Sequence, residues 1–111
     1  MNLSTKTLEI VNESQSKEKL EAVITLLETR LAEHEIVPTE LQWTILINHL
    51  NEMLKRSTSA ETIPDVDPAM FTEVSKEALT IAAEVVETIG NLTEAELYVL
   101  SIHFEAAKNN D

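Results

Sequence analysis

Turn-forming residues are scarce in this chain, and their scarcity limits the folds that it can adopt. The 111 residues include one glycine and three prolines. A fold built from many short β-strands is disfavoured, because β-hairpins depend on glycine, proline and similar turn residues. Long helices joined by few loops satisfy this composition, and the length suits one domain with a single core. We therefore expect an all-α fold.

Apolar residues recur at helical spacing in four segments of the sequence. We predict helices over residues 16–35, 39–56, 67–90 and 94–108, with a break near Ser75 as an alternative for the third. Pro38 separates the first two, because the residue before a proline is disfavoured in helical geometry. The short connection between them favours antiparallel neighbours. Residues 1–16 form an N-terminal extension or a short helix, and residues 17–111 form the main helical domain.

Capping signals define several of the predicted helix ends. Asp67 followed by Pro68 is typical of a helix start, and Gly90 is typical of a helix end. Thr93 with Glu96 three residues later predicts a capping box at the start of the last helix. In the helix over residues 39–56 we expect these side chains to face the core: Leu41, Ile45, Leu46, Leu50, Met53 and Leu54.

The charge balance and the absence of cysteine exclude several kinds of partner and site. Twenty acidic residues against eight basic ones give a net charge of −12, which would repel a phosphate backbone, so direct nucleic-acid binding is not expected. The chain has no cysteine for disulfides or thiolate metal sites. It has no apolar run of membrane-spanning length and no apolar signal core at its start, so we expect a cytoplasmic protein without membrane contact.

Two histidines share helix faces with charged residues. His49 lies seven residues before Arg56, and His103 lies seven residues after Glu96. An imidazole nitrogen is a usable nucleophile at neutral pH, so both histidines are candidate acceptor residues. The alternative is that both are ordinary packed or solvated helix residues, which is the commoner situation for a histidine. Glu52 and Arg56 are spaced as a local i, i+4 ion pair, and His34 suits the C-terminus of the first helix.

The segments LAEHEIVPTELQWTILINHLNEMLKR and DPAMFTEVSKEALTIAAEVV, followed by LTEAELYVLSIH, resemble the PTS regulation domain, or PRD, over about residues 17–108. That family has a histidine seven residues before an arginine, matched by His49 and Arg56. It also has an acidic pair that precedes a second histidine, matched in part by Glu96 and His103. Ala95 stands where the family usually has aspartate, and Ser75–Lys76 replaces an aromatic–proline pair.

The resemblance implies a compact bundle of about five helices in antiparallel pairs, without catalytic activity of its own. It implies that His49 and His103 accept phosphoryl groups from the bacterial sugar phosphotransferase system, with HPr or an enzyme II component as donor. Arg56 and Glu96 would be the supporting charges, and the domain would form a homodimer. Such domains normally accompany an RNA-binding antiterminator or a DNA-binding activator module. The sequence contains neither module, so we expect a stand-alone domain that modulates transcription or antitermination through protein contacts.

Other classes of function have less support in the sequence. No Ser/His/Asp arrangement or glycine-rich phosphate loop is present, so no catalytic residue and no cofactor are expected. The three histidines lack i, i+4 spacing and a cysteine partner, so no metal site is expected. Two alternatives remain: a phosphocarrier of the helical enzyme IIA kind, and a dimerisation module with inert histidines. Trp43 and Tyr98 are expected to serve core packing or a dimer seam.

Overall fold

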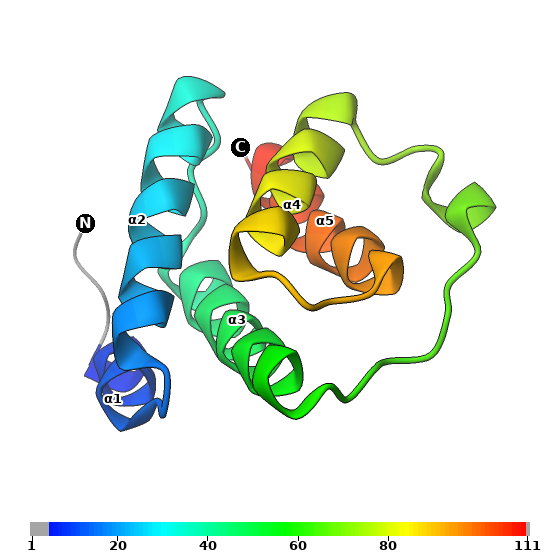
Figure 1. Cartoon of the computed structure of the whole chain (residues 1–111). Helices are drawn as coiled ribbons and strands as arrows, with labels where there is room; N and C mark the ends of the chain where they lie inside the picture. Colours follow the sequence, from blue (N-terminus) through cyan, green and yellow to red (C-terminus); the bar gives the residue numbers. More distant parts are fainter. Residues whose placement is uncertain (1–4, 111) are drawn as a thin grey trace.

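The computed structural model describes residues 5–110, and the elements in this range are helices. They are α1 (Thr5–Glu13), α2 (Lys17–Glu33), α3 (Glu40–Ser59), the 3₁₀ helix η1 (Pro68–Phe71), α4 (Lys76–Ile89) and α5 (Glu94–Lys108) (Figure 1). The predicted all-α bundle of about five helices is confirmed for this part of the chain. A short helix does occupy most of the segment before residue 17, although its treatment as a separate extension stays a prediction.

The segment over residues 67–90 is divided in the structure, as the alternative with a break near Ser75 predicted. Asp67 caps the 3₁₀ helix by accepting a hydrogen bond from the backbone N–H of Ala69. Ser75 then caps α4 by accepting a hydrogen bond from the N–H of Ala78. At the other end of α4, Gly90 has a φ of 78° and a ψ of 165°, which residues with a side chain rarely adopt. Gly90 therefore ends the helix, as its position in the sequence predicted.

The capping box lies at a different helix from the one that the sequence indicated. Thr39 and Gln42 form a reciprocal capping box at the start of α3, with hydrogen bonds of 2.9 and 3.1 Å. At α5, Thr93 makes no side-chain capping bond, so the capping box predicted for Thr93 and Glu96 was wrong. The reason is that the Glu96 carboxylate binds Arg56 of α3 instead.

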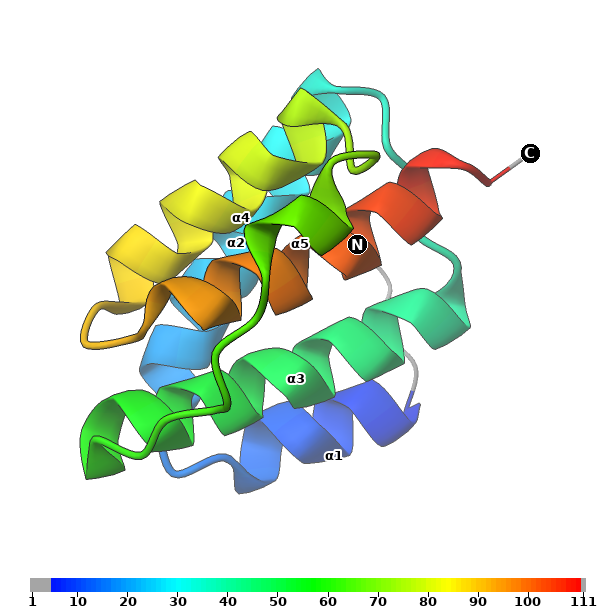
Figure 2. The same ribbon diagram turned by 90° about the vertical axis from the view of Figure 1, so that its right-hand side faces the viewer.

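The directions of neighbouring helices follow from the contacts between their side chains. α2 and α4 run antiparallel, because Arg30 pairs with Glu84 at 2.8 Å while His34, further along α2, lies 3.5 Å from the earlier Glu77. α4 and α5 are antiparallel neighbours joined by a short loop (Figure 2).

α1 and α3 run parallel, since two hydrogen bonds between them join residues with the same sequence separation. The hydroxyl groups of Thr7 and Thr44 lie 2.7 Å apart, and the Ser14 hydroxyl donates to the side-chain oxygen of Asn51 at 2.6 Å. α1 therefore packs along the outer side of α3 (Figure 2).

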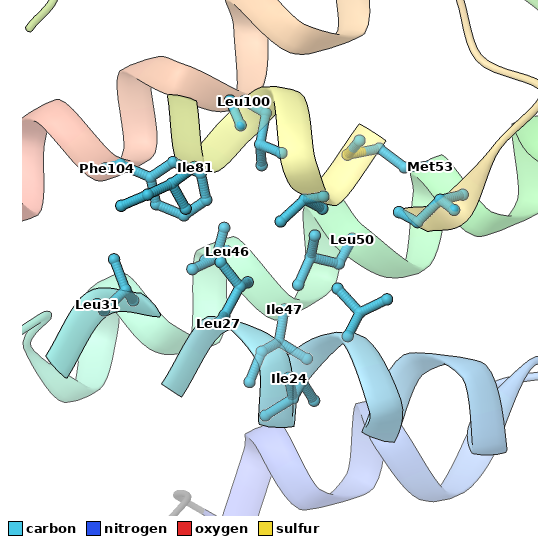
Figure 3. Close-up of a cluster of buried hydrophobic side chains, with 14 of the residues drawn as sticks. Ile24, Leu27, Leu31, Leu46, Ile47, Leu50, Met53, Ile81, Leu100 and Phe104 are labelled. Carbon is cyan, nitrogen blue, oxygen red and sulfur yellow. The ribbon is translucent and has the colours of Figure 1, made fainter. Parts of the chain in front are cut away.

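Apolar side chains from α2, α3, α4 and α5, nearly all of them aliphatic, fill the centre of the bundle (Figure 3). The cluster includes Ile24, Leu27, Leu31, Leu46, Ile47, Leu50, Met53, Ile81, Leu100 and Phe104. Four of the six side chains expected to face inward from residues 39–56 do so. The prediction was wrong for Leu41 and Ile45, which are 69% and 50% exposed. They lie in the first turns of α3, on the face that also carries the exposed Asn48 rather than on the buried stripe.

Candidate functional site

His49 and His103 meet at the contact between α3 and α5. Nδ1 of His49 lies 2.9 Å from Nε2 of His103, which is hydrogen-bond distance. The ring centroids are 4.9 Å apart, and the ring planes are inclined by 47°. Both side chains are half-buried, so each ring packs against the bundle and keeps part of its surface in contact with solvent.

Two helical turns from the histidine pair, Arg56 and Glu96 form a bidentate ion pair. Nε of Arg56 donates to one carboxylate oxygen of Glu96 at 2.6 Å, and Nη2 donates to the other at 2.7 Å. The Glu96 side chain is 1% exposed and that of Arg56 is 19% exposed. Parallel hydrogen bonds of this kind fix both the distance and the orientation of the partners. The pair therefore sets the register between α3 and α5.

The matched sequence spacings explain why both pairs form together. Seven residues span about two helical turns, or roughly 10 Å along a helix. The histidine precedes the charged residue in α3 and follows it in α5. When the two helices run antiparallel, alignment of Arg56 with Glu96 also aligns His49 with His103. α3 and α5 do run side by side in opposite directions (Figure 2).

Sequence reasoning identified all four of these residues but assigned Arg56 a different partner. The i, i+4 spacing predicted a pair between Glu52 and Arg56, whereas the guanidinium of Arg56 binds Glu96 and the Glu52 carboxylate lies 3.3 Å from Nζ of Lys55. The repeated seven-residue spacing of histidine and charge was the available signal for the contact between helices. It becomes informative only when the direction of the two helices is known.

The environment of the pair favours uncharged imidazole rings. The pKa of His49 is lowered to about 4, first because burial disfavours the charged ring and then because His103 and Arg56 oppose a positive charge there. Burial also lowers the pKa of His103. The hydrogen bonds to Glu96 raise the pKa of Arg56. At neutral pH the site therefore combines two neutral imidazoles with a neighbouring permanent cation, and an uncharged imidazole has a nitrogen lone pair available for attack.

A small apolar cavity of about 150 Å³ adjoins His103. It is lined by Pro38, Gln42, Ile45, Leu46, His103, Phe104 and Ala106. Ile102, one residue before His103, is 49% exposed, and Ala106 follows it on the same face of α5. We call the exposed residues Leu41, Ile45, Ile102 and Ala106 the apolar patch. The patch places exposed apolar surface next to the histidine pair.

The other residues considered from the sequence lie away from this site. His34 follows α2 as its C-cap, with Nδ1 3.5 Å from a carboxylate oxygen of Glu77. Tyr98 packs against Phe71 of the 3₁₀ helix, with ring centroids 5.2 Å apart, and Trp43 packs against the core cluster. Across residues 5–110, no group of three or more His, Asp or Glu side chains is arranged to hold a metal ion. No helix in the same range has the length and apolar composition to cross a bilayer.

Comparison with known proteins agrees with this arrangement. The model of the family described as the PRD domain matches residues 21–107, so the chain belongs to the PRD domain family. The chain is also similar to a PRD-containing transcription regulator from Lactobacillus casei ATCC 334, whose crystal structure superposes with a TM-score of 0.92. The two share 45% sequence identity over 98% of this chain and 97% of the other. No curated protein matches the chain.

Proposed function

We propose that this chain is a phosphorylation-responsive regulatory domain of the sugar phosphotransferase system, with His49 and His103 as its phosphoacceptor residues. The observation that carries the proposal is the half-buried histidine pair, with Nδ1 of His49 2.9 Å from Nε2 of His103, two helical turns from Arg56 in a member of the PRD domain family. The phosphoryl donor is HPr or an enzyme II component. The domain acts by protein contact in the cytoplasm and carries out no catalysis of its own.

The chemical argument concerns the charge that phosphorylation brings to a packed helix contact. A phosphorylated side chain carries roughly −1.5 to −2 charges and several strong acceptor oxygens at neutral pH. At the contact of α3 with α5, such a group lies two turns from a guanidinium whose carboxylate partner is already fully buried. Phosphorylation would therefore change both the charge and the packing of this contact, which is what a regulatory switch requires.

The exposure of the rings favours this proposal over the dimerisation module with inert histidines. That alternative predicts two wholly buried rings, whereas both side chains here are half-buried. The likeness to a transcription regulator points to control of gene expression as the output, through transcription or antitermination.

A homodimer is the second part of the proposal. The apolar patch exposes two large aliphatic side chains on α3 and one on α5, next to the site that would be modified. Exposed apolar surface rimmed by polar groups is typical of protein contact sites. Because the chain has a net charge of −12, a phosphoryl group beside the patch would increase the repulsion between two copies.

Phosphoryl transfer from purified phosphotransferase proteins tests the proposal directly. The protein is incubated with phosphoenolpyruvate, enzyme I and HPr, and its intact mass is measured near neutral pH before and after brief acid treatment. We expect a mass gain of phosphate that acid removes, because the N–P bond of phosphohistidine is acid-labile. His49→Ala and His103→Ala assign the gain to a position. A protein that gains no phosphate from HPr or from an enzyme II component lacks the proposed function.

A further inference from the structure

The hydrogen bond between the two histidines restricts which ring nitrogens can react. Nδ1 of His49 and Nε2 of His103 face each other, and within residues 5–110 neither ring makes a further hydrogen bond. A neutral imidazole has one N–H and one bare nitrogen. If His49 donates through Nδ1, its Nε2 is bare and His103 has its proton on Nδ1. If His103 donates through Nε2, its Nδ1 is bare and His49 has its proton on Nε2.

In either arrangement, one outward-facing nitrogen has a lone pair and the other carries a proton. We propose that His49 and His103 form a single phosphoacceptor unit, in which one ring takes one phosphoryl group on its outer nitrogen while the other ring takes the released proton. This inference rests on the proposed function and extends it to stoichiometry, to the position of the N–P bond and to the fate of the proton.

The transfer step can be written with every bond and proton accounted for. The donor is a protein phosphohistidine whose other ring nitrogen is protonated. The bare Nε2 of His49 attacks its phosphorus, the donor N–P bond breaks, and the electron pair of that bond stays on the donor ring, which leaves as neutral imidazole. As the new N–P bond makes the His49 ring positively charged, its Nδ1 proton moves across the 2.9 Å hydrogen bond to Nε2 of His103, so that His49 ends as a neutral phosphorylated imidazole.

The product arrangement explains why only one phosphoryl group is accepted. His103 now has protons on both nitrogens and therefore no lone pair with which to attack a second donor. Its positive charge also lies beside the phosphoryl dianion, so the two groups stabilise each other. A second dianion on a ring whose centroid is 4.9 Å away would be opposed by like-charge repulsion. The mirror case, with attack by Nδ1 of His103 and His49 as proton acceptor, follows the same logic.

The test measures phosphate stoichiometry and linkage in the full chain after exhaustive transfer from phosphorylated HPr. Intact mass gives the number of phosphates, and nuclear magnetic resonance of the phosphorylated protein distinguishes the two ring nitrogens. We expect at most one phosphate per chain, on Nε2 where His49 is modified and on Nδ1 where His103 is modified. Two phosphates on one chain, or a linkage through either nitrogen of the shared hydrogen bond, overturns this inference and leaves the proposed function standing. Absence of any phosphate overturns both.

Substitutions of His103 separate proton transfer from packing. In His103→Gln, the amide oxygen can still accept a hydrogen bond from Nδ1 of His49 but cannot take its proton. We expect His49 to gain one phosphate on Nε2 in this variant, with a transfer rate lower by about 100-fold, which is the lower end of what a positioned proton acceptor usually contributes. A His103→Gln rate equal to the wild-type rate assigns His103 a packing role and overturns the inference. His34→Gln, on a helix away from the pair, is the matched control and should leave the rate unchanged.

Discussion

At the scale of single residues, the stability of the site depends most on Glu96, because its carboxylate is 1% exposed and has Arg56 as its charged partner. Removal of one member of a buried ion pair leaves the other as an uncompensated charge. We predict that Arg56→Met lowers the free energy of unfolding by about 3 kcal/mol, the usual cost of stranding a buried charge. Urea unfolding followed by circular dichroism measures this change.

Substitution of the other partner of the ion pair, Glu96, should lower the free energy of unfolding by less. Glu96→Gln leaves the charge on Arg56, which is 19% exposed and can turn towards water. Arg30→Ala, which breaks the more exposed pair with Glu84, is the matched control and should have a much smaller effect than Arg56→Met. If Arg56→Met proved as mild as Arg30→Ala, the Glu96 carboxylate would not depend on the guanidinium.

The lowered pKa of His49 predicts how the free energy of unfolding depends on pH. The folded pKa of about 4 lies below the unfolded value of about 6.5, so between these values the unfolded chain binds more protons. Stability from His49 is therefore fully present above pH 6.5 and is lost as the pH falls towards 4. Because the ring is half-buried and partly screened by solvent, we expect a loss of about 1–2 kcal/mol across this window.

The comparison of wild type with His49→Gln isolates this contribution from the many carboxylates that titrate at lower pH. The difference in unfolding free energy between the two proteins should shrink as the pH falls from 7 to 4.5. His103, Arg56, Glu96 and Glu52 also act on His49 and are present in both proteins, so the difference reports on His49 together with its coupling to these groups. A difference that stays constant across this range would contradict the lowered pKa.

At the scale of helices, the sequence predicted boundaries well where the signal was local. Ser75 and Gly90 mark real helix ends because each acts through its own backbone or through bonds to adjacent residues, and Pro38 lies in the loop that separates α2 from α3. The capping box assigned to Thr93 and Glu96 failed for the opposite reason. A carboxylate that can reach a guanidinium on another helix binds it in preference to its own helix terminus, and the local pattern contains no information about that competitor.

This difference between the two threonines can be measured. Thr39→Ala removes the capping bond to Gln42 and should destabilise the protein by about 1 kcal/mol. Thr93→Val keeps the shape of the side chain and replaces a buried hydroxyl that has no hydrogen-bond partner within the described residues. Its effect should be neutral or slightly stabilising, because no bond is lost and an unsatisfied polar atom is removed. A clear loss of stability in Thr93→Val would show that its hydroxyl does cap α5.

At the scale of the whole molecule, the arrangement of helices was the part that sequence patterns could not supply. The pairing of His49 with His103 depends on α3 and α5 lying antiparallel in one register, which joins residues 54 positions apart. The exposure of Leu41 and Ile45 is a different case, because the helical period itself places both on the face of α3 that carries the exposed Asn48. That face points away from the buried residues Leu46, Leu50 and Met53, so the prediction was wrong in assigning every large apolar residue of the segment to one stripe.

The apolar patch provides the last prediction, which concerns association of whole molecules. We expect the chain to dimerise through this patch, so Ile45→Ser should raise the dissociation constant at least about tenfold, as expected when a large buried aliphatic side chain is lost from an interface. Met70→Ser, at an exposed apolar residue of the 3₁₀ helix, is the matched control and should leave it unchanged. Sedimentation equilibrium over a range of protein concentrations measures the dissociation constants of both variants.

Phosphorylation should also raise the dissociation constant of the dimer. This effect should become smaller at high salt, because the added repulsion is electrostatic and is screened by ions. A wild-type chain that stays monomeric at all concentrations would leave the patch free for another protein and contradict the dimer.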